Sequence, residues 1–133
     1  MASAWPSGRT LRGRYLCQNE SRMSGARLTA GLWVSAYLNR LRLAGIAAYV
    51  IAKGDATAGA VVVKVATMDG AARLFERRFD LETDRRVWSL LAEGGEGEMD
   101  AILTRARTRD RDLWVIEIED RAGRHLLGEE GLD

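Results

Sequence analysis

The sequence is short of the side chains that form cross-links and metal centres. Its 133 residues include one cysteine, Cys17, and one histidine, His125. One cysteine excludes an internal disulfide, and these two side chains are too few for the three or four ligands of a zinc site. No run of about 18 apolar residues is present, so we expect no membrane-spanning segment. We therefore predict no metal and no cofactor.

An excess of charge is also missing, with 20 Lys and Arg residues against 19 Asp and Glu residues. This balance gives no general attraction to nucleic acid or anionic lipid. The charge is uneven, because residues 1–27 hold five arginines and one glutamate, a net charge of +4, which leaves −3 for the rest of the chain. This basic arm has little apolar periodicity, so we expect residues 1–24 to be disordered.

Three interpretations of the arm stay open. Met23 is the true start and the first 22 residues are an annotation artefact, or the arm is an untargeted extension, or it is a targeting or nucleic-acid-binding arm. In each case the length of the chain predicts a single globular domain over residues 25–133.

Hydrophobic periodicity predicts two helices. Trp33, Tyr37 and Leu41 recur at four-residue steps, which is typical of an amphipathic helix, here over residues 30–44. A second helix is expected over residues 96–109, because acidic residues crowd its first turns and arginines its end, as the helix dipole favours.

The remaining segments predict strands at 47–53, 61–65, 72–79, 86–91 and 113–119, with 124–127 as a further candidate edge strand. The second of these is apolar on both faces and is expected at the centre of the sheet. The loops between the first four strands are too short for parallel crossovers, so we expect an antiparallel meander. The order αββββαβ predicts an α+β fold with an antiparallel sheet of four to six strands and both helices packed on one face.

Helices on one face would leave the opposite face of the sheet apolar and open. Large exposed apolar patches usually mark contact sites, so we expect a homodimer or a protein partner on this face. Trp88 and Trp114 are candidate anchors, because tryptophan is enriched at interface hot spots. The alternative is that both tryptophans are ordinary core residues.

Two polar groups are further candidate binding residues. Asp55 and Thr57 offer oxygen atoms in a glycine-bounded loop, and loops on rigid scaffolds often carry function. Arg40 and Arg42 lie on the polar side of the first helix and suit an anionic partner. The alternatives are a plain hairpin loop and a solvated helix face.

Catalytic motifs are missing. The sequence has neither a phosphate-binding loop with its lysine nor a Gly-x-Ser-x-Gly elbow, and His125 lies in a charged turn where we expect it to be solvated. We therefore predict a non-enzymatic interaction module with no catalytic residue.

Two alternative functions stay open. The element order resembles the core of restriction-endonuclease-like nucleases, so Asp55 and Glu76 would bind a metal ion in a nuclease or phosphodiesterase. Against this, Arg78 stands where those enzymes have lysine. The second alternative is nucleic-acid binding by the basic arm.

Over residues 26–132 the chain resembles a small bacterial family known as domain of unknown function 1491. The segments that carry this resemblance are 26–34, 54–61, 75–80 and 112–120. The resemblance implies a compact cytoplasmic protein that begins near Met23, and it implies no activity, cofactor or site.

Overall fold

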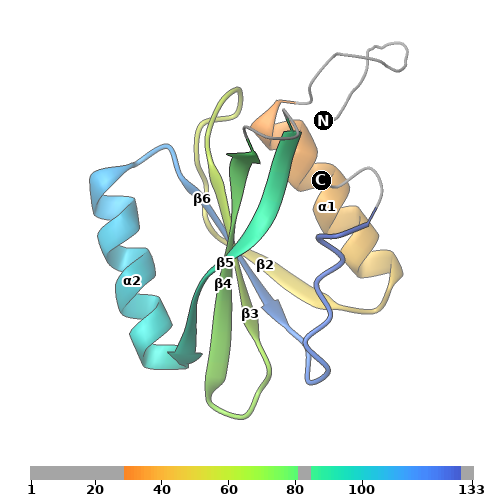
Figure 1. The fold of residues 1–133 in the computed structure, drawn as a ribbon. Helices are drawn as coiled ribbons and strands as arrows, with labels where there is room; N and C mark the ends of the chain where they lie inside the picture. Colours follow the sequence, from red (N-terminus) through yellow and green to blue (C-terminus); the bar gives the residue numbers. More distant parts are fainter. Residues whose placement is uncertain (1–28, 81–84, 130–133) are drawn as a thin grey trace.

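The computed structural model describes residues 29–80 and 85–129, which form a five-stranded sheet and two helices (Figure 1). In chain order these are α1 (Ala30–Leu43), β2 (Ala47–Ala52), β3 (Val61–Ala66), β4 (Ala71–Asp80), β5 (Arg85–Gly95), α2 (Glu96–Arg109) and β6 (Trp114–Glu119). The predicted α+β fold and the order αββββαβ are confirmed. The basic arm lies outside the described residues.

Local signals place the helix ends. The Thr29 side chain accepts a hydrogen bond from the N–H of Leu32 at 3.4 Å and caps α1. Gly45, with φ of 76°, follows its last turn in the left-handed conformation that glycine favours. Neither helix among the described residues is long and apolar enough to cross a membrane.

The predicted antiparallel meander is confirmed for β3, β4 and β5, but β2 does not pair with β3. The strand order of the sheet is β2-β6-β3-β4-β5, so the last strand of the chain lies between the first two. The β3–β6 pair is parallel and the other three pairs are antiparallel. A parallel pair is feasible here because the connection from β3 to β6 runs through β4, β5 and α2, which is long enough for a crossover. The central place predicted for β3 is confirmed, and all six of its residues are buried.

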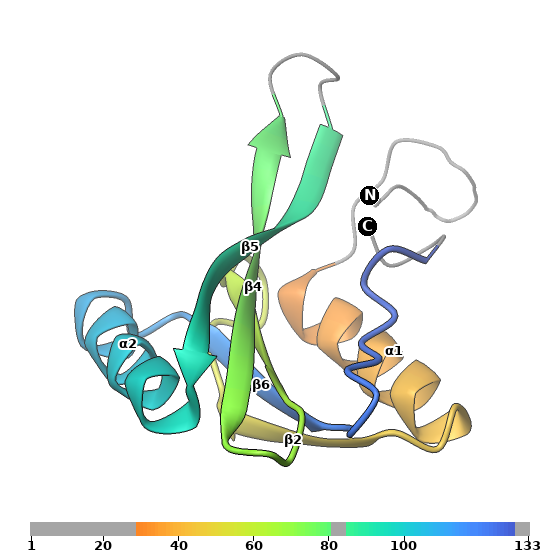
Figure 2. The ribbon, with the colours of Figure 1, turned by 60° about the horizontal axis from the view of Figure 1, so that its bottom comes forward.

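The prediction that both helices pack on one face is wrong. The helices lie on opposite sides of the sheet, as Figure 2 shows. Successive side chains of a strand point to opposite faces. Accordingly Val63 packs in the core under α1, whereas Val62 packs with Met99 and Leu103 of α2. Because β3 and β6 carry apolar residues on both faces, burying them requires a helix on each side.

The segment that follows β6 is not a strand, so the candidate edge strand at 124–127 is also wrong. Leu127 is instead fully buried in the core under α1. The hydroxyl of Tyr37 on α1 donates a 2.6 Å hydrogen bond to the carbonyl of His125, which fixes this segment against the helix.

Candidate functional site

The loop between β2 and β3 holds Asp55 and Thr57 in a packed connection. The carboxylate of Asp55 accepts hydrogen bonds from the N–H groups of Thr57 at 3.1 Å and Ala58 at 2.8 Å. The carbonyl of Asp55 accepts one from the indole Nε1 of Trp114 at 2.8 Å. A Cβ atom at Gly54 would lie 2.1 Å from the carbonyl oxygen of Asp112, so glycine is required there.

The two predicted anchor tryptophans lie against the core under α1. Trp114 is only 5% exposed. The ring of Trp88 is 5.3 Å from that of Trp33, and the guanidinium of Arg77 lies over both rings, at 5.1 Å from Trp33 and 5.6 Å from Trp88. Both predicted anchors, Trp88 and Trp114, therefore make their contacts with other residues of the same chain.

The predicted arginines lie near the C-terminal end of α1. Arg40 forms an ion pair with Glu129 at 3.4 Å. Arg42 donates a hydrogen bond to Asn39 and lines a hollow between α1 and β2.

The structure brings no metal ligands together around the predicted carboxylates. Glu76 lies on β4 opposite Val62, and the carboxylate of Asp55 is held by its own loop. Residues 29–80 and 85–129 contain no group of three or more His, Cys, Asp or Glu side chains that could hold a metal ion.

A buried lysine on the α2 side is the main polar feature that the sequence analysis missed. The ammonium of Lys64, in the middle of β3, lies 2.7 Å from Asp100, 2.9 Å from Glu96 and 3.4 Å from Glu117. Its side chain is 3% exposed. We call these four residues the Lys64 cluster.

The carboxylates keep Lys64 charged. Burial alone would lower its pKa, but the hydrogen bonds to Asp100 and Glu96 and the negative charge of Glu117 together outweigh burial and raise the pKa above its ordinary value. The sequence signal was a single lysine within a run of valines. Its partners were hidden because two of them belong to α2, which was expected on the same face of the sheet as α1.

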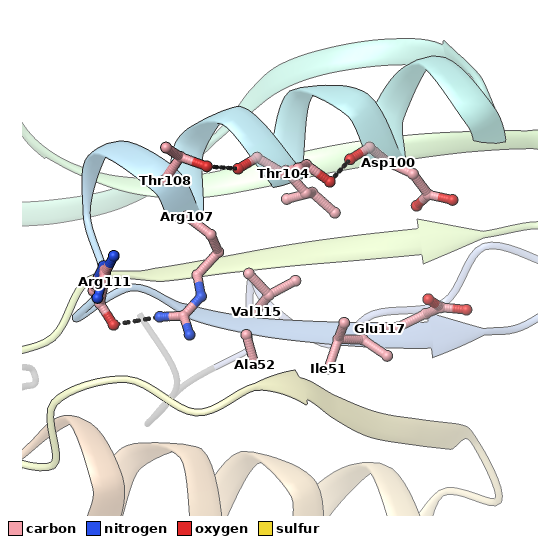
Figure 3. Close-up of a pocket in the computed structure, with 10 residues that line it drawn as sticks. Ile51, Ala52, Asp100, Thr104, Arg107, Thr108, Arg111, Val115 and Glu117 are labelled. Atoms are coloured by element: carbon pink, nitrogen blue, oxygen red, sulfur yellow. Dashed lines mark hydrogen bonds between the residues drawn. The ribbon is translucent and has the colours of Figure 1, made fainter.

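A groove of about 760 Å³ lies beside the Lys64 cluster, between α2 and the strands β6 and β2. Figure 3 shows Asp100 and Glu117 toward one end and Arg107 and Arg111 toward the other. We call it the α2 groove; it is lined by Ile51, Ala52, Asp100, Leu103, Thr104, Arg107, Thr108, Arg111, Val115 and Glu117.

Strand β2 is an edge of the sheet that neither helix covers fully. Its sequence, Ala-Ala-Tyr-Val-Ile-Ala, carries no charge. Tyr49 is 51% exposed, Val50 41% and Ile51 57%. Ile51 and Ala52 line the α2 groove, and Ala47 to Tyr49 line the hollow beside α1, which measures about 740 Å³.

Comparison with known proteins identifies the family. The model of the family described as protein of unknown function (DUF1491) matches residues 28–128. A crystal structure of a DUF1491 family protein from Caulobacter crescentus CB15 has 44% identity, covers 77% of this chain and 94% of that chain, and has a TM-score of 0.67. An NMR structure of a DUF1491 family protein from the same organism has 44% identity, coverage of 79% and 96%, and a TM-score of 0.69.

A third structure agrees with these two. The solution structure of protein Atu0922 from A. tumefaciens has 33% identity, covers 71% of this chain and 86% of that chain, and has a TM-score of 0.61. No curated protein matches the chain. The resemblance found in the sequence is confirmed, and the chain belongs to the DUF1491 family.

Proposed function

We propose that this protein is a non-enzymatic interaction module that self-associates through its edge strand β2. The observation that carries the proposal is an uncharged edge strand with three large apolar side chains exposed, Tyr49, Val50 and Ile51. The interacting surface is thus the edge of the sheet rather than one of its faces, since each face carries a helix.

An unpaired edge strand is a template for another strand, and natural proteins usually blunt it with charge, proline or a bulge. Strand β2 has no charge and no proline. Its one irregularity is a register shift between Val50 and Ala52, which leaves residues 47–50 as regular strand. By contrast, the other edge strand, β5, carries a charge at Glu93 near its end.

A second copy of the chain fits this edge better than a charged partner does. In a two-fold dimer the same surface serves both copies, so each uncharged strand would pair antiparallel with an uncharged strand. No charged side chain of β2 would be buried, and with the two-fold axis near Val50, each Val50 would meet its own counterpart. The hollow between β2 and α1 leaves room for side chains of the second copy.

Sedimentation velocity of the full chain over the micromolar range tests the proposal. We expect a dimer for the natural chain and a monomer for Val50→Lys, because two lysines would meet near the two-fold axis. The matched control is Leu90→Lys, which places the same charge at a residue 48% exposed on the opposite edge strand and should leave the dimer intact. A monomeric natural chain, or a Leu90→Lys variant that alone becomes monomeric, would contradict the proposal.

A further inference from the structure

The α2 groove has two ends of opposite charge and an apolar floor. Arg107 and Arg111 lie at one end and Asp100 and Glu117 at the other (Figure 3). The floor between them is formed by Ile51, Ala52, Leu103 and Val115. A volume of about 760 Å³ is within the usual range for ligand sites, which combine an apolar lining with a few placed polar groups.

The basic end of the groove carries positive charge that is not neutralised within the described residues. The Nη1 atom of Arg107 donates to the carbonyl of Leu113 at 3.0 Å and to that of Arg111. These carbonyls orient the half-buried guanidinium but do not neutralise it, and within the described parts of the chain no carboxylate pairs with Arg107 or Arg111. An oriented guanidinium is well suited to bind a carboxylate through two parallel hydrogen bonds.

The acidic end carries excess negative charge. Three carboxylates surround the one ammonium of Lys64, which leaves two negative charges without compensation in the cluster. Glu117 and Asp100 both line the groove, and the side chain of Asp100 is 58% exposed. A cationic group entering this end would therefore be attracted.

The spacing between the ends sets the length of the ligand. Asp100 and Arg107 are seven residues apart on α2, which corresponds to about 10 Å along a helix that rises 1.5 Å per residue. Three residues of extended chain span about 10 Å as well. A single small anion or cation would occupy only one end.

We propose that the α2 groove binds the C-terminal segment of a partner polypeptide in extended form. The terminal carboxylate contacts Arg107 and Arg111, and the last three residues, which are apolar, cover Val115 and Ile51. A Lys or Arg side chain three residues before the terminus contacts Asp100 and Glu117. The site borders the β2 edge through Ile51 and Ala52, but Val50, on which the proposed self-association is centred, does not line the groove.

Fluorescence anisotropy tests the proposal on the full chain. The probe is a labelled hexapeptide, Gly-Gly-Lys-Val-Leu-Val, with a free carboxylate. We expect that amidating its terminus, or replacing its lysine with glutamate, weakens binding about tenfold or more, since each change removes a charged hydrogen bond.

Protein variants locate the binding site. Arg111→Gln should weaken binding of the free-carboxylate peptide, because the exposed Arg111 contributes to the basic end. The matched control is Arg109→Gln, at the end of the same helix but outside the groove lining, which should leave binding unchanged.

Three outcomes would overturn the proposal. They are equal affinity for the acid and the amide peptides, no binding up to about 1 mM peptide, and displacement of the peptide by a single-stranded oligonucleotide whose own binding depends on Arg111. The Val50→Lys variant is measured in parallel. Peptide binding retained in that variant separates the groove from the β2 edge, so a failure of self-association does not count against the groove.

Discussion

The same strands carry different kinds of side chain on the two faces of the sheet. On the α1 side the strands bury Val61, Val63 and Val65 under a helix whose Trp33 and Tyr37 rings stack at 4.8 Å. On the α2 side the same strands carry Lys64 and Glu117 beside a smaller apolar cluster and an open groove. One face therefore supplies most of the apolar core, and the other carries charged side chains and an open groove.

The largest expected difference between the faces is in core truncation. Leu41→Ala on the α1 side should lower the free energy of unfolding by about 3–4 kcal/mol, because Leu41 is completely buried. Leu103→Ala on the α2 side should cost about 2 kcal/mol, because Leu103 borders the groove and is 8% exposed. Urea denaturation measures both, and an equal or larger loss for Leu103→Ala would remove the distinction.

A second difference is electrostatic. Lys64→Met should lower the free energy of unfolding by about 2–3 kcal/mol, because it leaves three carboxylates without their cation. The control is Lys53→Met, which changes the only other lysine, an exposed one, and should cost less than about 0.5 kcal/mol. If the two variants lose equal stability, the Lys64 cluster does not stabilise the fold.

The Lys64 cluster also predicts a loss of stability in alkali. The pKa of Lys64 is raised by folding, so its contribution is complete below the ordinary lysine pKa of 10.5 and is lost as pH rises toward the folded value. We expect the melting temperature of the natural chain to fall above pH 10.5 more steeply than that of Lys64→Met. An equally steep fall of the melting temperature with pH in the two proteins would contradict a stabilising role for the charged Lys64.

The smallest effect is expected in acid, from a group on the α1 side. Burial, and then the charge of Arg73, lower the pKa of His125, whose Nδ1 accepts a hydrogen bond from the N–H of Leu127 at 3.1 Å. The unfolded chain therefore takes up a proton first, and stability should decline as pH falls below about 6.5. His125→Gln should flatten this decline between pH 7 and 5, as followed by thermal denaturation.

Local signals in the sequence predicted the helices well and the sheet order poorly. Thr29 and Gly45 mark the ends of α1 because capping depends on a few neighbouring residues. The insertion of β6 between β2 and β3 joins residues far apart in the chain, and no short pattern encodes it. The sequence analysis expected helices on only one face of the sheet. However, Val63 and Ile116 point to one face and Val62 and Val115 to the other, so each face needed a helix to cover it.

The wrong predictions about the candidate site have the same cause, because its contacts also join residues far apart in the chain. His125, expected to be solvated, is half-buried with its ring 4.7 Å from that of Phe75. Lys64 finds Glu96 and Asp100 only because α2 covers the face to which Lys64 points. Asp55 was correctly placed in a loop, but the close approach of this loop to Asp112 joins residues far apart in the chain, which composition does not reveal.

Backbone hydrogen exchange of the natural chain at low and high protein concentration tests self-association through β2 most directly. We predict that amides within Ala47–Ala52 exchange more slowly as concentration rises, while amides of the opposite edge strand, β5, do not change. Exchange in β2 that is independent of concentration, or slowing that occurs in β5 alone, would contradict the account.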